Sequence, residues 1–120
     1  YLNNGGVLLS DRFRDLILEN RSEGRTWLHV GLEGTKSNRS GIGARVEVHV
    51  GERKLFQEKV AGQGFSSTNS PYLIFGLDGA KAADKVVIHW PSGEKQELPP
   101  LAANQALIVT EGKEALRRIY

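Results

Sequence analysis

Two polar segments that contain glycine carry residue types suited to ligand recognition. The first, residues 34–43, runs directly into an alternating strand, and the second, residues 61–71, is rich in Gly, Ser and Asn. Amide, hydroxyl and cationic side chains beside backbone N–H groups suit sugar hydroxyls or carboxylates. The candidate ligand-binding surface comprises Lys36, Asn38, Arg39, Gly64, Ser67 and Asn69. The competing interpretation is that both segments only carry the chain between sheets.

The sequence contains no motif that supports catalysis. Its serines lie outside any Gly-x-Ser-x-Gly elbow, and the pair Lys36-Ser37 lacks the preceding glycine of a phosphate-binding P-loop. A strand, rather than the helix that follows a P-loop, is expected next. Cysteine is absent, which excludes disulfides, thiolate metal sites and cysteine nucleophiles. We therefore expect no catalytic residue and no cofactor.

A metal site would need ligands that converge, and the histidines are the best candidates for it. His29, His49 and His89 fall on three separate expected strands, each on the more polar face. No short His-x-His spacing links them, and the sequence has no EF-hand pattern of oxygen donors. Histidines that face solvent from strands are the expectation, and no metal ligand is assigned.

Composition and charge describe one small domain without a strong electrostatic preference. The 120 residues are 39% hydrophobic and 25% charged, with a net charge of +2 spread along the chain, so nucleic acid is not an expected partner. No apolar run approaches the roughly 18 residues of a membrane span. The chain starts at Tyr1 without the pattern of a signal peptide, and we interpret it as a C-terminal piece of a larger protein.

Short strands separated by turn residues predict an all-β fold. From Ala44 to Val50, apolar residues alternate with Arg45, Glu47 and His49, which is the period of a half-buried strand. Further strands are expected at residues 26–32, 53–60, 72–77, 85–90, 95–98 and 106–110. The short run at residues 13–19 fits a strand or a helix, and we interpret it as a strand. Tight turns after the strand that ends at Val50 and after Trp90 predict two β-hairpins.

The end of the chain has a different periodicity. Residues 112–120 show the spacing of a short helix, with Ala115, Leu116 and Ile119 on one side.

Trp90 shares its strand face with aliphatic residues, so we expect it to pack in the core rather than stack on a ligand. The predicted fold class is an all-β antiparallel β-sandwich of about seven to nine short strands with a short C-terminal helix.

Four ordered segments together resemble the ASPIC/UnbV domain over residues 25–111. They are Trp27-Leu28-His29-Val30 with Gly34-Thr35-Lys36-Ser37-Asn38-Arg39 and Gly41-Ile42-Gly43-Ala44-Arg45-Val46; Gly62-Gln63-Gly64-Phe65-Ser66-Ser67-Thr68-Asn69-Ser70; Phe75-Gly76-Leu77; and Val87-Ile88-His89-Trp90-Pro91-Ser92-Gly93. No single segment is specific, but their order is.

The resemblance implies a module at the C-terminal end of secreted proteins, after FG-GAP or VCBS repeats that build a β-propeller. Residues 1–24 would then be a linker or the end of the propeller, 25–111 the sandwich and 112–120 a helical tail. We expect a non-enzymatic, extracellular or cell-surface accessory module whose partners are the upstream propeller and a glycan or an extracellular protein. The alternative is a subdomain that completes a pocket of a propeller-based enzyme.

Overall fold

The computed structural model describes residues 16–19, 21, 23–64, 68–114 and 116–119. Within these residues the chain has ten strands and no helix, so the prediction of an all-β fold is confirmed. The strands are β1 (Trp27–Glu33), β2 (Arg45–Val50), β3 (Arg53–Glu58), β4 (Leu73–Gly76), β5 (Ala82–Ala83), β6 (Lys85–His89), β7 (Lys95–Leu98), β8 (Leu101–Ala102), β9 (Gln105–Thr110) and β10 (Leu116–Arg118).

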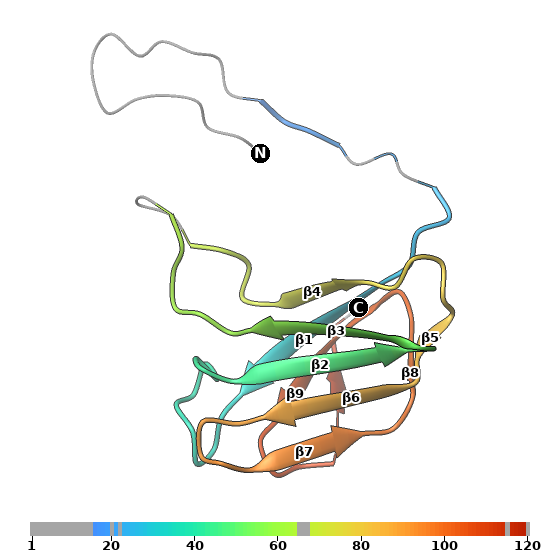
Figure 1. Ribbon diagram of the computed structural model, residues 1–120. Coiled ribbons are helices and arrows are strands. Elements are labelled where there is room, and N and C mark those ends of the chain that lie inside the picture. Colours follow the sequence, from blue (N-terminus) through green and yellow to red (C-terminus); the bar gives the residue numbers. More distant parts are fainter. Residues whose placement is uncertain (1–15, 20, 22, 65–67, 115, 120) are drawn as a thin grey trace, which may run out of the picture.

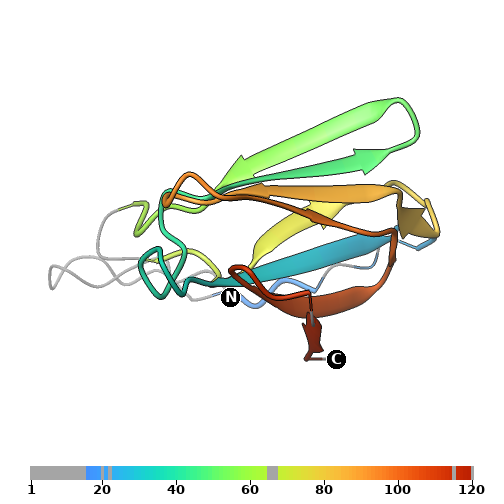
Figure 2. The same ribbon diagram turned by 90° about the horizontal axis from the view of Figure 1, so that it is seen from below.

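The strands form two layers with a small pair at one end (Figures 1 and 2). One sheet has the order β10-β9-β1-β4, and the other has the order β3-β2-β6-β7. The two-residue strands β5 and β8 pair with each other. The sequence did not predict this pair, because two residues are too few to show a period.

The core fills the space between the two sheets, as the alternating pattern predicts. Leu28 and Val30 of β1 are fully buried, whereas Trp27 and His29 on the opposite face are partly exposed. β2, β6 and β9 supply most of the remaining aliphatic side chains: Val46, Val48, Val50, Val86, Ile88, Leu107 and Val109. Alternate residues of a strand point to opposite faces, so the local pattern was enough to select the core face.

The two predicted hairpins and the burial of Trp90 are confirmed. β2 pairs with β3 up to Val50↔Arg53, and β6 pairs with β7 up to His89↔Lys95. Trp90 is 3% exposed, and its indole N–H donates to Gln96 Oε1 at 2.9 Å. A buried indole needs such an acceptor, so this tryptophan is a core residue with a satisfied polar atom.

One strand pair corrects the expectation of a purely antiparallel sandwich. β1 and β9 run parallel, from Leu28↔Gln105 to Glu33↔Thr110. Parallel neighbours need a long crossover connection, and here strands of the other sheet lie between them in sequence. Local periodicity carries no information about the direction of a distant partner.

The prediction of a C-terminal helix is wrong. In the described part of residues 112–120, Leu116–Arg118 form β10, which pairs antiparallel with β9. A tight turn reverses the chain, because Gly112 has a φ of +71° and the Lys113 N–H donates to the Thr110 carbonyl at 3.1 Å. So short a helix is marginal in water, whereas pairing with the open edge of β9 satisfies the backbone.

Two further expectations fall wholly or partly outside the described residues. Of the strand expected at 13–19, only residues 16–19 are described, and they belong to neither sheet; Leu16, Ile17 and Leu18 are exposed there. Ser67 of the candidate surface lies in the range 65–67, which is also outside the description.

Candidate functional site

A buried carboxylate fixes the start of the 34–43 loop. Glu111 follows β9 directly and is only 2% exposed. Its Oε2 accepts the backbone N–H groups of Thr35, Lys36 and Ser37 at 2.8, 2.8 and 2.7 Å. Its Oε1 accepts the hydroxyls of Ser37 and Ser92 at 2.8 and 2.5 Å. One side chain thus joins the loop, the turn after β6 and the end of β9.

This carboxylate is ionised and has no free acceptor position for chemistry. Burial alone raises the pKa of Glu111, but the Ser37 N–H, the Ser92 and Ser37 hydroxyls and the Thr35 N–H outweigh that effect and lower the pKa to about 2. So acidic a group is a poor general base near neutral pH. We interpret Glu111 as an anchor of the loop.

The rest of the loop closes on itself. The Gly34 N–H donates to the Arg39 carbonyl at 3.0 Å, and the Asn38 side chain both donates to the Ile42 carbonyl and accepts the Ile42 N–H, at 2.7 and 2.9 Å. A Cβ at Gly34 would lie 2.2 Å from the Asn38 carbonyl oxygen. Only glycine fits there, which explains the residue that opens the loop.

Lys36 contacts the β6–β7 turn. Its Nζ donates to Glu94 Oε2 at 3.0 Å, and this hydrogen bond raises the pKa of Lys36. Lys36 and Asn38 are therefore engaged within the domain, the first by an exposed ion pair and the second by the loop backbone.

The other side of the loop meets the second polar segment at a hollow of about 250 Å³, which we name the loop hollow. Ser40 and Ile42 line it from the first segment, and Thr68, Asn69 and Ser70 line it from the second. The two segments predicted from the sequence to carry recognition residues therefore lie side by side. Asn69 is in this lining, whereas Gly64 is exposed and belongs to none of the hollows described here.

A neighbouring hollow of about 260 Å³ has several cationic side chains in its lining, and we name it the cation hollow. Arg39, Lys59 and Arg117 line it together with the carboxylate of Glu33. It shares Ser40, Lys59 and Pro71 with the loop hollow, so the two hollows adjoin. Arg39, a residue of the predicted surface, faces this cation hollow.

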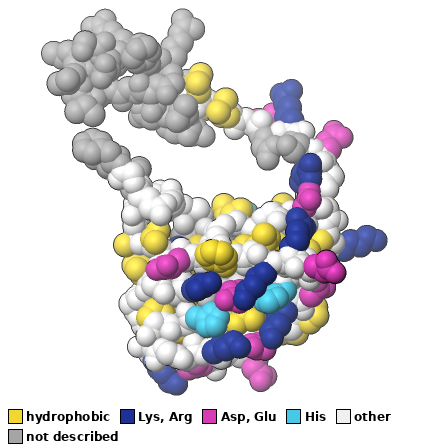
Figure 3. All heavy atoms as spheres, in the orientation of Figure 1, with side chains coloured by type: hydrophobic (Ala, Val, Ile, Leu, Met, Phe, Trp, Pro, Cys, Tyr) yellow, Lys and Arg dark blue, Asp and Glu magenta, His cyan; other side chains and the backbone are white. Residues whose placement is uncertain are grey.

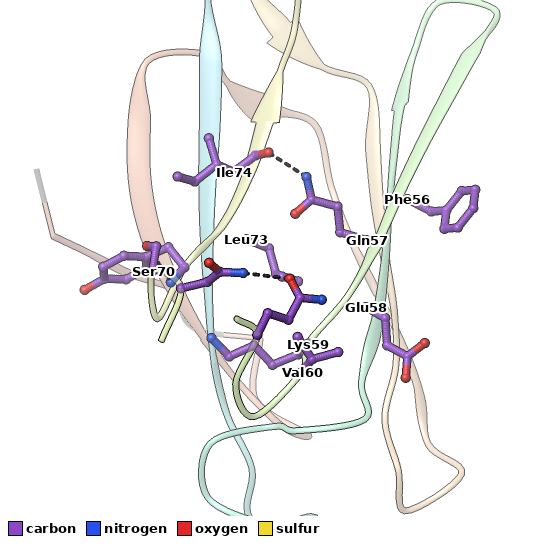
Figure 4. Close-up of a pocket in the computed structure, with 11 residues that line it drawn as sticks. Phe56, Gln57, Glu58, Lys59, Val60, Ser70, Leu73 and Ile74 are labelled. Carbon is purple, nitrogen blue, oxygen red and sulfur yellow. Dashed lines mark hydrogen bonds between the residues drawn. The ribbon is translucent and has the colours of Figure 1, made fainter. Parts of the chain in front are cut away.

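A third hollow, of about 580 Å³, lies between the edge strands β3 and β4 of the two sheets (Figure 4). Polar side chains bridge it: Gln57 donates to the Ile74 carbonyl at 2.7 Å, and Asn69 donates to Gln63 Oε1 at 2.7 Å. Phe56 is 63% exposed at its rim. The first of these hydrogen bonds joins the two sheet edges, and the second lies within the second loop.

Lys59 lines all three hollows and connects the two loops. Its backbone continues the β2–β3 ladder, since the Gly43 N–H donates to its carbonyl at 2.7 Å and its N–H donates to the Ala44 carbonyl at 2.8 Å. Its Nζ donates to the Pro71 carbonyl. Burial lowers the pKa of Lys59, because the charged form loses part of its hydration.

Sequence reasoning missed Glu111, Lys59 and Ser92 as residues of this end of the domain. An acidic residue directly after the apolar β9 was a weak signal of a buried anchor, and Ser92 lay in one of the recognised motifs without an assigned role. Lys59 carried no signal, because its place depends on how the two loops fold back.

The histidines do not converge. His49 and His89 lie on the outer face of the β3-β2-β6-β7 sheet, with their Nε2 atoms 3.8 and 3.3 Å from carboxylate oxygens of Glu47, whereas His29 is in the other sheet. Lys54 reaches the same carboxylate at 2.7 Å, and its hydrogen bond lowers the pKa of Glu47. Among the described residues, no group of three or more His, Cys, Asp or Glu side chains is placed to hold a metal ion.

The comparisons with known proteins support the family that the motifs suggest. Residues 34–116, more than half of the chain, match the family described as ASPIC and UnbV, so the chain belongs to this family. The match includes the anchor Glu111 and both loops. Neither the comparison with curated proteins nor the comparison with solved structures found a match. No helix in the described ranges is long and apolar enough to cross a membrane.

Proposed function

We propose that this domain is a non-enzymatic accessory module that follows an FG-GAP-type propeller in an extracellular protein and binds a glycan or a protein ligand through its two loops. Membership of the ASPIC and UnbV family is consistent with an accessory module of FG-GAP proteins. The observation that carries the binding role is the loop hollow, where Ser40 and Ile42 meet Thr68 and Asn69 across two distant segments.

The anchoring of the first loop supports this role. Glu111 holds residues 35–37 with three backbone hydrogen bonds, so the loop is ordered before any ligand arrives. A preorganised loop binds at a lower entropic cost than one that must fold on its ligand. The hydroxyl and amide groups around the loop hollow can both donate and accept hydrogen bonds, as sugar hydroxyls require.

Glycan-array binding and a pull-down from extracellular material, both with the folded 120-residue chain, test the proposal. We expect binding that Asn69→Ala weakens, because this change removes an amide from the loop hollow, while Lys113→Ala at an exposed turn on another surface leaves binding unchanged. A folded chain that binds no glycan and no protein would refute the binding role. Fractionation of cells that express the full-length protein tests the extracellular location.

A further inference from the structure

The cation hollow contains charge that the domain itself does not neutralise. Arg39, Lys59 and Arg117 line it, and none of the ion pairs between described residues includes any of these three cations. The one carboxylate in the lining, Glu33, accepts the Thr110 hydroxyl at 3.2 Å instead. The lining therefore has three cations and one anion, none of them in an ion pair there.

The chemistry of these cations selects a ligand group. Guanidinium groups bind carboxylate and sulfate through paired hydrogen bonds, and an ammonium group adds a point charge. Lys59 is partly buried, and its Nζ donates to the neutral carbonyl of Pro71, so an incoming anion would restore the stabilisation that its charge loses on burial.

The shape of the surface adds a second requirement. At about 260 Å³ the cation hollow is smaller than the roughly 300–1,000 Å³ of pockets that enclose a drug-sized ligand, so it suits one charged unit of a longer molecule. The adjoining loop hollow offers the hydroxyls of Ser40, Thr68 and Ser70 and the amide of Asn69. The two hollows share Ser40, Lys59 and Pro71, and a chain of sugars with acidic groups presents both kinds of partner on neighbouring units.

We infer that the ligand is an acidic polysaccharide, with a carboxylate or sulfate group held between Arg39, Lys59 and Arg117 and with neighbouring sugar hydroxyls in the loop hollow. This inference rests on the proposed binding function and specifies its ligand class. In this arrangement the two loops have different roles. Arg39 of the first loop binds the acidic group of the polysaccharide, and Asn69 of the second loop contacts its uncharged sugar hydroxyls.

Binding of the 120-residue chain to immobilised polymers tests the inference. Dextran and dextran sulfate differ only in their sulfate groups, and alginate supplies carboxylates. We expect dextran sulfate, alginate or both to bind at least tenfold more tightly than dextran, and we expect Arg39→Gln and Arg117→Gln each to weaken that binding by about tenfold.

Arg118→Gln is the matched control, because the next residue of β10 points to the opposite face and lines a different hollow. It should change binding by less than about twofold, since it removes the same charge elsewhere. Equal weakening by Arg118→Gln would show an unspecific charge effect and overturn the inference. So would the absence of binding to both acidic polymers, although a protein ligand would still satisfy the proposed function.

Two other outcomes separate the inference from the proposed function. Binding to a neutral glycan that neither arginine variant changes would refute the acidic ligand and leave the binding role intact. Poly-glutamate could also bind with the same dependence on Arg39 and Arg117 and at least as tightly as the acidic polysaccharides. That result would assign the cation hollow to acidic peptides and refute the inference that the ligand is a polysaccharide.

Discussion

The charged side chains on the two sides of the 34–43 loop differ in whether the domain itself provides their partners. On one side Glu111 is buried, and donors from the loop and from Ser92 fill its oxygens. On the other side Arg39, Lys59 and Arg117 line an open hollow without a carboxylate partner among the described residues. A buried charge must be satisfied internally or the fold is destabilised, whereas an exposed charge without a partner is free to serve a ligand.

Three lysines on the outer face of the β3-β2-β6-β7 sheet are paired with carboxylates. Lysines and histidines gather on this face together with acidic side chains (Figure 3). Lys54 lies 2.7 Å from Glu47, and Lys85 and Lys95 lie 2.7 and 2.8 Å from Glu97. These exposed pairs contribute little to stability, but they neutralise the face locally. What distinguishes the cation hollow is that three cations gather in one lining and that none of the ion pairs between described residues includes them.

The largest effect on stability is expected at the anchor. Glu111→Ala leaves the N–H groups of Thr35, Lys36 and Ser37 without their charged acceptor in a partly buried place, so the free energy of unfolding should fall by about 3 kcal/mol. Urea denaturation measures the change. Glu114→Ala is the matched control, because Glu114 is an exposed residue three positions later. A loss at Glu111 no greater than at Glu114 would contradict the role of the anchor.

The same anchor predicts an acid-dependent loss of stability. The pKa of Glu111 is about 2 in the folded state against an ordinary value of 4.5, so the unfolded state binds the proton more tightly. The stabilisation is complete above about pH 4.5 and is lost as the pH falls toward 2. We expect the stability difference between the wild type and Glu111→Gln to shrink over this range in chemical denaturation at each pH. Since Glu97 also has a pKa of about 2, only this difference isolates Glu111, and a constant difference would contradict the assignment.

The smallest effect on stability is expected at the cation hollow. Arg39→Gln and Arg117→Gln remove charges that have no ion-pair partner among the described residues, so the free energy of unfolding should change by less than about 0.5 kcal/mol. Thermal unfolding of both variants beside Arg118→Gln checks this. A loss above about 1 kcal/mol at either arginine would mean that the residue has a structural role and would remove the contrast between the two sides of the loop.

The strands and hairpins could be predicted because their information is local. The alternation from Ala44 to Val50 selects the buried face of β2, and the Pro91-Ser92-Gly93 turn fits the reversal between β6 and β7. β10 was mistaken for a helix because three apolar residues in so short a segment fit either period, and the open edge of β9 decided between them. The parallel direction of β1 and β9 was equally invisible in either strand alone.

The candidate surface was predicted only in part, for a related reason. The residue types of Arg39 and Asn69 were apparent in the sequence, and both line adjoining hollows in the folded chain. Lys36 and Asn38 have the same types but are engaged by Glu94 and by Ile42, and one N–H of Asn69 is likewise engaged by Gln63. A polar side chain either makes hydrogen bonds within the domain or keeps that capacity for a ligand. Which of the two occurs depends on its neighbours in space, and sequence spacing does not contain that information.

The sequence by itself determined the family, the all-β class and the face that most strands bury, because each depends on motifs or on a period of two residues. Only the tertiary structure decided that Glu111 joins two distant segments to the end of β9 and that Arg117 joins Arg39 and Lys59 at one hollow. Burial and charge pairing depend on contacts between segments far apart in the chain, and such contacts exist only once the two sheets have packed.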